Sequence, residues 1–255
     1  MKKKIYFVTN SDKSRKMIQD KFKKYFRIII NLKNIYTSSY AVAEKIKEKE
    51  NKNEIKELAY VIGKSGILDE LKEHHIDVKQ EDHNEKKYED FRIDDVDPNI
   101  TSVVCGFDST INAYKIAYAS SCLRYNKNCQ FFVTCPDQHH VSCDGSILPG
   151  TASYWKPVQC ATNIDPVVAG KPNPFLMEKL IKDHHLESKK ENERIVMIGD
   201  TIETDVHFGK NNTVSTLLVL SGTTKEKDLD YYYFKENNNK PDFIIDNIFE
   251  IFRLY

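Results

Sequence analysis

The segment from Val196 to Asp205 constrains the fold of this chain more than any other part of the sequence. A short apolar run ends in Gly199-Asp200, and a second aspartate, Asp205, follows five residues later. A buried parallel strand that ends in this way delivers carboxylates to the carboxyl edge of its sheet, where open α/β folds bind their ligands. The segment therefore predicts a parallel α/β sheet with a ligand site at that edge.

The carboxylates of this segment need a nearby cation, because close carboxylates disfavour each other's charged form. A Mg2+ ion suits them, since it binds a few carboxylates together with water and substrate phosphate. Upstream, Gly170-Lys171-Pro172 supplies a positive charge for an anionic substrate. We expect Asp200 to ligate Mg2+ and Asp205 to ligate it through water or to orient the site. Lys171 is expected to neutralise phosphate charge and to keep an attacking carboxylate ionised.

A further polar segment, Thr9-Asn10-Ser11, follows the apolar run from Ile5 to Val8. At the carboxyl end of a strand, the Thr9 hydroxyl and neighbouring N–H groups can bind phosphate oxygens. Taken alone, each segment has a structural alternative. Thr9-Asn10-Ser11 would be a helix N-cap, Lys171 a surface lysine, and Gly199-Asp200 a turn or cap. Taken together, the segments occur in the order expected for phosphate chemistry, and each follows an apolar strand or begins a helix. This combination favours a phosphate site over the structural alternatives.

Strand-like and helix-like segments alternate along almost the whole chain, which is typical of α/β architecture with parallel sheets. Strands are predicted at 5–8, 28–30, 35–36, 59–63, 102–107, 130–134, 166–169, 194–198, 215–220 and 242–245. Helices are predicted at 14–26, 40–49, 66–74, 111–125 and 175–184. Polar stretches are predicted to be solvated loops at 49–57, 79–95, 187–193 and 235–240.

Composition excludes several classes of function. Lys+Arg and Asp+Glu both number 38, so no basic field argues for nucleic-acid binding. No apolar run approaches the roughly 18 residues that a membrane span needs. The six cysteines form no Cys-x-x-Cys pair, and the adjacent histidine pairs lack the spacing of a helical metal site. We therefore expect reduced thiols in a cytoplasmic protein rather than a zinc cluster or a disulfide framework.

These segments resemble a known family. The chain is similar to the haloacid dehalogenase-like hydrolases, specifically to the branch of p-nitrophenyl (4-nitrophenyl) phosphatases, phosphoglycolate phosphatases and pyridoxal phosphatases. Thr9-Asn10 matches the second motif of that branch, Lys171 the third, and Asp200 with Asp205 the fourth. The longer stretches that also fit are 168–175 and 196–205, and the run 144–151 resembles the cap segment of the branch.

The resemblance implies a Rossmann-like parallel-sheet core that is interrupted by a large inserted α/β cap domain. Residues 1–39 and 165–255 would form the core, and residues 40–164 the cap. It also implies a Mg2+-dependent phosphomonoester hydrolase that acts through an aspartyl-phosphate on a small phosphorylated metabolite, without nucleic-acid or membrane partners. Caps in this branch often mediate dimerisation, which makes a homodimer through the cap a candidate assembly.

The first motif of the family, Asp-x-Asp-Gly, is absent from these 255 residues. In the family it ends the first core strand, and its two aspartates serve as nucleophile and general acid–base. Cys143-Asp144-Gly145 lacks the first aspartate and lies in the expected cap. We therefore expect an N-terminally incomplete chain that lacks one β-α unit of roughly 30 residues and is inactive as written. The alternative is a catalytically dead member that binds a phosphate ligand or a protein partner.

One residue of the expected cap bears on the substrate. In the pyridoxal phosphatase members a histidine stands at the place of His140, in the loop 136–145, and reaches toward the substrate. The resemblance thus implies that His140 contacts the substrate and that the chain prefers an aromatic or bulky phosphate monoester. The alternative is an ordinary surface histidine.

Overall fold

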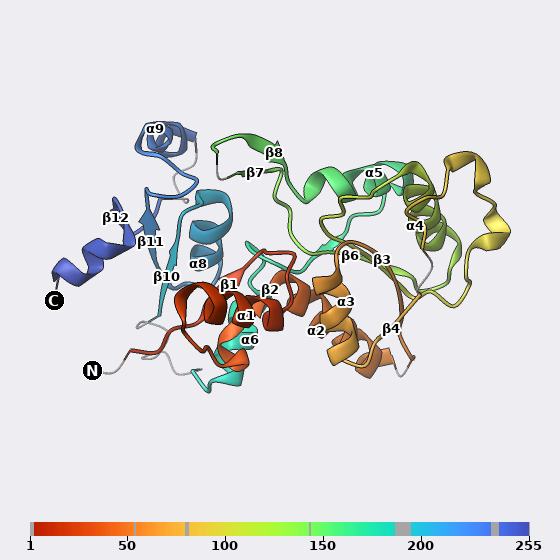
Figure 1. The fold of residues 1–255 in the computed structure, drawn as a ribbon, viewed down its shortest axis with the longest axis horizontal. Coiled ribbons are helices and arrows are strands. Elements are labelled where there is room, and N and C mark those ends of the chain that lie inside the picture. The colour runs from red at the N-terminus through yellow and green to blue at the C-terminus, as the bar shows by residue number, and fades with distance from the viewer. Residues whose placement is uncertain are drawn as a thin grey trace. The chain divides into compact units, whose positions relative to one another are not determined.

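The computed structural model describes residues 3–53, 55–79, 82–142, 144–186, 195–235 and 240–254. The chain forms two compact units, Met1–Gly170 and Lys171–Tyr255. Both units contain parallel sheets with helices between successive strands (Figure 1), which confirms the α/β class. The core and cap boundaries proposed at 39/40 and 164/165 stay a prediction.

The first unit contains a small parallel sheet and a larger one. β1 (Phe7–Thr9) pairs in parallel with β2 (Ile35–Thr37), and α1 (Arg15–Phe26) connects them along the chain. The larger sheet has the order β4-β3-β5-β6-β9, and all its pairings are parallel. Its strands are β3 (Leu58–Ile62), β4 (Asp77–Val78), β5 (Ser102–Cys105), β6 (Gln130–Val133) and β9 (Val167–Val168).

The helices of the first unit cover both faces of this larger sheet (Figure 1). They are α2 (Ser38–Asn53), α3 (Ser65–Glu73), α4 (Ala113–Tyr125) and α5 (Ala152–Thr162), with short 3-10 turns at Leu32–Asn34, Tyr88–Asp90 and Ile93–Asp95. Because β4 and β5 lie on opposite sides of β3, the sheet has its switch point between β3 and β5. An antiparallel hairpin, β7 (His139–Val141) and β8 (Ile147–Pro149), follows β6.

Apolar clusters of the described residues stabilise the first unit. The larger one joins the central strands of the five-stranded sheet to α4 and α5, and includes Tyr60, Tyr118, Phe131 and Trp155. The smaller one lies between β1, α1 and β2 and is made by Ile18, Ile30 and Ile35 with the half-buried Phe7 and Phe22.

The second unit has a three-stranded parallel sheet of order β10-β11-β12, with strands at Val196–Gly199, Ser215–Val219 and Phe243–Ile245. Its helical segments are α6 (Phe175–Asp183), a π-helical turn (Ile202–Val206), α8 (His207–Asn211), α9 (Glu226–Lys235) and a 3-10 turn (Ile248–Leu254). Ile202, Val206 and Leu218 form its buried cluster. Among the described residues β10 pairs only with β11, and its side chains Val196 and Ile198 are exposed.

Most of the predicted elements are present, but one predicted strand is wrong. Residues 28–30 are irregular because Arg27, in the left-handed conformation, ends α1 and turns the chain back. The carbonyl of Ile30 then accepts a hydrogen bond from the side chain of Gln19 on α1 (2.7 Å) instead of pairing with a strand. Cys143 and the polar stretch 187–193 lie outside the described residues.

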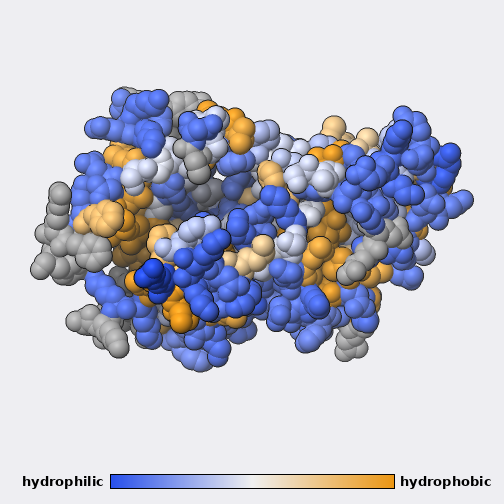
Figure 2. Space-filling view, in the orientation of Figure 1, coloured by the Kyte–Doolittle hydropathy of each residue, from blue (hydrophilic) through white to orange (hydrophobic). Residues whose placement is uncertain are grey.

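The face seen in Figure 2 is mostly hydrophilic, with separate apolar areas. Among the described residues, no helix is both long and apolar enough to cross a membrane.

Candidate functional site

In the second unit, a buried ion pair joins two of the predicted site residues. The Lys171 ammonium donates to Oδ1 of Asp205 at 2.5 Å, and both side chains are buried. Oδ2 of Asp205 accepts the backbone N–H groups of Asp200 (3.0 Å) and Thr201 (3.2 Å). Both carboxylate oxygens of Asp205 therefore accept hydrogen bonds, and its expected roles, ligation through water or orientation of the site, stay predictions. The burial of Lys171 excludes its interpretation as a surface lysine.

The turn after β10 can form only around a residue without a side chain. A Cβ on Gly199 would lie 2.2 Å from Oδ2 of Asp205. This close approach allows the Asp205 carboxylate to accept the N–H groups that follow Gly199. The close approach of Asp205 therefore explains why a glycine stands at position 199.

Asp200 is fixed by main-chain hydrogen bonds. Its Oδ2 accepts the backbone N–H of Thr223 at 2.7 Å, and its main-chain carbonyl accepts the N–H of Thr224 at 2.9 Å. Its other carboxylate oxygen, Oδ1, has no hydrogen-bond partner among the described residues. Asp200 therefore offers one open carboxylate oxygen.

This donor set fits one part of a Mg2+ site. Among the described residues no group of three or more His, Cys, Asp or Glu side chains is placed to hold a metal ion. Mg2+ does not require such a group, because it keeps several waters and binds one or two carboxylates together with substrate phosphate. Asp200 would hold the ion through Oδ1, whereas both oxygens of Asp205 already accept hydrogen bonds.

In the first unit, the polar segment after β1 forms a compact turn. The Thr9 hydroxyl accepts the N–H of Ser11 at 3.2 Å, and the carbonyl of Ser11 accepts the hydroxyl of Ser38 at 3.2 Å. The N-cap of α1 is Ser14, whose hydroxyl accepts the N–H of Met17. The N-cap interpretation of Thr9-Asn10-Ser11 is therefore wrong, and the segment precedes the helix cap.

Asn10 is held by a residue that the sequence analysis did not select. Its side-chain amide donates to Oδ1 of Asp137 at 3.2 Å. Asp137 lies in the loop after β6, where the Cys135 thiol donates to its Oδ2 (3.2 Å) and the Trp155 indole fixes the carbonyl of Cys135 (3.1 Å). Burial raises the pKa of Cys135 to about 12, so this thiol stays a neutral donor. The position of Asp137 just beyond a strand's carboxyl end is the signal that could have identified it.

His140 lies on the exposed hairpin strand β7, and its ring faces the ring of Phe107. Its Nδ1 is 3.2 Å from the carbonyl of Pro149, and its ring meets the Phe107 ring edge-on at 6.3 Å. Phe107 also contacts Tyr154 (4.7 Å between ring centroids) and lies under the ammonium of Lys64 (4.1 Å). This surface has aromatic rings beside the Lys64 ammonium, whose charge is paired with Asp12 (3.1 Å), so the aromatic rings suit a bulky organic group.

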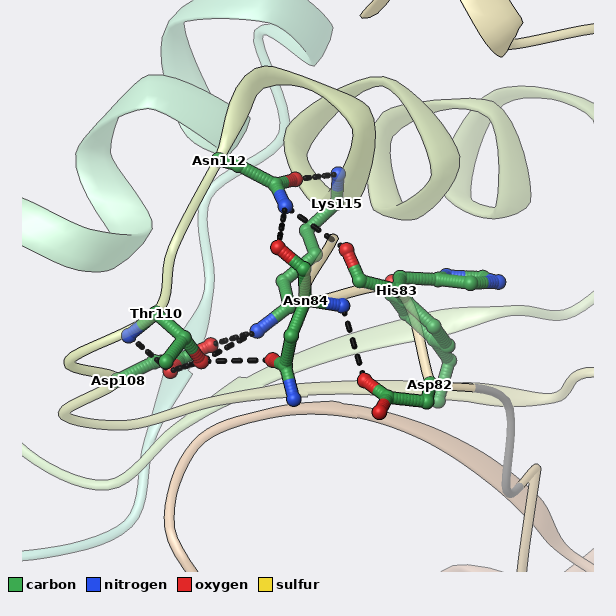
Figure 3. A network of polar contacts seen from close by, with 8 residues as sticks. Asp82, His83, Asn84, Asp108, Thr110, Asn112 and Lys115 are labelled. Atoms are coloured by element: carbon green, nitrogen blue, oxygen red, sulfur yellow. Dashed lines mark hydrogen bonds and ion pairs between the residues drawn. The ribbon is translucent and has the colours of Figure 1, made fainter. Parts of the chain in front are cut away.

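A buried polar network fixes the loop that carries Phe107 (Figure 3). Oδ2 of Asp108 accepts the Lys115 ammonium at 2.6 Å, and its Oδ1 accepts both the N–H and the hydroxyl of Thr110 (2.8 Å each). The amide of Asn112 ties the same loop to the carbonyl of His83 at 2.8 Å. Because Asp108 and Lys115 are both buried, this network orders the β5–α4 loop.

Comparison with known proteins identifies the family. Residues 1–77 match the family model described as haloacid dehalogenase-like hydrolase, and residues 168–251 match one described as HAD-hydrolase-like. Phosphoglycolate phosphatase 2 of Arabidopsis thaliana is 32% identical over 99% of this chain and 82% of its own length. The 4-nitrophenylphosphatase of Schizosaccharomyces pombe is 30% identical over 96% of this chain and 81% of its own length. The chain spans only 66% of phosphoglycolate phosphatase 1A of Arabidopsis thaliana, at 33% identity.

Solved structures have the same fold. The p-nitrophenyl phosphatase from Archaeoglobus fulgidus superposes with a TM-score of 0.79 at 24% identity, covering 99% of this chain and 87% of that one. A p-nitrophenyl phosphatase assigned in Bacillus subtilis gives a TM-score of 0.72 at 26% identity, with 98% and 82% covered. This chain belongs to the haloacid dehalogenase-like hydrolase family, within its branch of phosphoglycolate and p-nitrophenyl phosphatases.

Proposed function

We propose that this chain is the larger part of a Mg2+-dependent phosphomonoester hydrolase for a small phosphorylated metabolite. One observation carries the proposal. The buried Lys171 is paired with Asp205, which also accepts the main-chain N–H of Asp200. Asp200 in turn keeps one carboxylate oxygen without a hydrogen-bond partner among the described residues. Such an arrangement supports the binding of a cation and of a phosphate group.

Each site residue has a proposed role. Asp200 holds the Mg2+ ion, which when bound polarises a phosphoryl oxygen as a Lewis acid. Lys171 stabilises negative charge on the phosphate, and Asp205 positions Lys171 and the turn after β10. Thr9, Asn10 and Ser11 bind phosphate oxygens through hydroxyl, amide and main-chain N–H groups.

The nucleophile has to come from an added segment. Transfer through an aspartyl-phosphate requires a carboxylate nucleophile and a general acid–base, and no Asp-x-Asp-Gly sequence occurs in the 255 residues. We propose that the chain alone is inactive and becomes active when a strand ending in this motif is joined to its N-terminus. Two features of β10 support this proposal: among the described residues it pairs only with β11, and its side chains Val196 and Ile198 are exposed, whereas strands of parallel sheets are normally covered.

The relatives suggest which substrates to test. They are named for phosphoglycolate and for 4-nitrophenyl phosphate. The aromatic group formed by His140, Phe107 and Tyr154 supports an aromatic or bulky phosphate monoester. We propose no nucleic-acid or membrane partner, a cytoplasmic location, and a homodimer through residues 40–164 as the candidate assembly.

A substrate panel tests the proposed function. The extended chain is assayed for phosphate release from p-nitrophenyl phosphate, phosphoglycolate and pyridoxal phosphate, with and without Mg2+ and as the Lys171→Met variant. We expect Mg2+-dependent release that Lys171→Met reduces by at least about a hundredfold, as expected when a group that stabilises transition-state charge is lost. Activity that is unaffected by EDTA or by Lys171→Met would contradict these roles.

The absence of the motif also supports a second candidate, a non-catalytic member that binds phosphate ligands. In that case, adding Asp-x-Asp-Gly would leave the chain inactive, while inorganic phosphate would still bind to the unmodified chain. Calorimetric titration with inorganic phosphate, alongside the activity assay, separates the two functions.

A further inference from the structure

The loop after β11 reaches across the sheet edge to Asp200. β10 and β11 are parallel neighbours, with Gly199 opposite Leu218, so the two chains leave the sheet at the same edge. Beyond β11 the backbone N–H of Thr223 donates to Oδ2 of Asp200 (2.7 Å), and the N–H of Thr224 donates to the Asp200 carbonyl (2.9 Å). Two consecutive main-chain groups thus bind one residue.

The approach of the two loops depends on the small size of Gly222. A Cβ on this glycine would lie 2.1 Å from Oδ2 of Asp200 and 2.3 Å from its Cβ. Gly222 does not have the positive φ that would by itself require a glycine. Space, rather than backbone conformation, therefore explains the glycine at this position.

Together these contacts fix Asp200 at three of its polar groups. Asp205 accepts its N–H, Thr224 holds its carbonyl and Thr223 holds one carboxylate oxygen. Oδ1 is the oxygen without a partner among the described residues. A carboxylate held in this way presents a single oxygen in a single orientation, and Mg2+ needs such fixed geometry because it tolerates little deviation from an octahedron.

We propose that Gly222 and Thr223 are positioning residues that set the divalent-cation affinity of Asp200. They act through Asp200 and do not touch the ion. The inference rests on the proposed function only in taking Asp200 as the cation ligand. Groups that orient a metal ligand typically change metal affinity by about 10- to 100-fold when altered.

The experiment measures the binding of Mn2+ alone, as a spin-active probe for the Mg2+ site, by electron paramagnetic resonance of the full chain. Gly222→Ala places its Cβ against the Asp200 carboxylate and should weaken binding at least about tenfold. Ser221→Ala is the matched control, since Ser221 is an exposed neighbour of Gly222 whose side chain makes no hydrogen bond with Asp200 in the described part of the chain, and it should bind as the wild type does. In the Asp200→Asn background, Gly222→Ala should cause no further loss.

Three results would overturn the inference. One is wild-type Mn2+ affinity in Gly222→Ala, and another is an equal loss of affinity in Ser221→Ala. The third is a wild-type Mn2+ affinity in Asp200→Asn. That result would also contradict the cation-binding role that the proposed function assigns to Asp200. Cation binding that depends on Asp200 but not on Gly222 would leave the proposed function intact.

A measurement on the wild-type chain covers the case in which Gly222→Ala does not fold. The amide resonance of Thr223 is followed by NMR while Mg2+ is added. Because this N–H donates to the carboxylate that would hold the ion, its shift should change with the same midpoint as cation binding. A Thr223 resonance that does not move during saturation with Mg2+ would overturn the inference.

Discussion

The ammonium of Lys171 lies 2.5 Å from Oδ1 of Asp205, and the two side chains are only 8% and 5% exposed. A buried pair of this kind is sensitive to the loss of one partner, because the remaining charge cannot be solvated. The same Asp205 also orders the turn after β10. Removing either charge should therefore affect both the stability of the second unit and the position of Asp200.

Lys171→Met should lower the free energy of unfolding of the second unit by about 3–5 kcal/mol, since it leaves the Asp205 carboxylate buried and unpaired. Urea denaturation, with hydrogen exchange of peptides from 195–219, measures the effect. Lys210→Met is the matched control, because the Lys210–Asp242 pair is exposed to solvent and contributes only about 0–1 kcal/mol. Equal losses in the two variants would contradict the importance of burial.

Asp137→Ala should release Asn10 and lower the stability of the first unit by about 1 kcal/mol, the usual net contribution of a hydrogen bond. It should also speed hydrogen exchange in the loop after β6, which Asp137 orders through Cys135. Glu85→Ala removes an exposed loop carboxylate that has no hydrogen-bond or ion-pair partner among the described residues, so it serves as the control and should leave stability unchanged. An Asp137→Ala protein with wild-type exchange in this loop would rule out the contact.

His140→Ala should leave stability within about 0.5 kcal/mol, because the side chain is exposed. In the extended, active protein it should change the ratio of kcat/KM for p-nitrophenyl phosphate over phosphoglycolate by roughly two- to tenfold, as expected for the loss of one aromatic contact. His139 is the natural control, since neighbouring residues of a strand point to opposite faces. If His139→Ala changes the ratio as much as His140→Ala does, or if neither does, the substrate role of His140 is wrong.

The thiol of Cys135 should resist alkylation in the folded chain. Burial raises its pKa to about 12, so at pH 8 only about one thiol in ten thousand is the reactive thiolate. Cys160 is exposed and should react with iodoacetamide within minutes. Mass spectrometry of the digested protein compares the two sites. Labelling of Cys135 at the rate of Cys160 in the folded protein would show that the loop after β6 is open.

The repeating strand–helix pattern was predictable because it is encoded locally. The helix at 14–26 has its apolar residues near one face, and the run that ends in Gly199-Asp200 is a buried strand signal followed by a turn. Both elements occur within one or two residues of the predicted bounds, as α1 and β10. The sequence selected Lys171, Asp200 and Asp205 as candidate site residues for the same reason, since each stands beside a recognisable element.

Other elements gave no local signal. Every residue of β7 and β8 is exposed, so the hairpin shows no alternation between apolar and polar residues. Helix α5 contains Pro157, which weakens a helical pattern. Residues 28–30 have the composition of a strand, but the end of α1 and the Gln19 side chain direct them elsewhere.

The contacts that complete the site are long-range and often made by the main chain. Asn10 and Asp137 are 127 residues apart, and Thr223 binds Asp200 through an N–H group that every residue except proline possesses. No spacing rule selects such partners. Asp200 and Thr223 follow neighbouring strands of one sheet, whereas Asn10 and Asp137 follow strands of two different sheets, and both arrangements become known only from the structure.

The central claim is that this chain becomes an active phosphatase when a strand ending in Asp-x-Asp-Gly is added to its N-terminus. The most direct test compares the rate of p-nitrophenyl phosphate hydrolysis with Mg2+ for the 255-residue chain and for the extended chain. We predict no turnover above the buffer rate for the 255-residue chain. For the extended chain we predict turnover of about 1–1000 per second, the common range for enzymes, and its loss when the first aspartate of the added motif is changed to Asn. Equal rates for the two chains, or an inactive extended chain that is folded and binds Mg2+, would contradict the account.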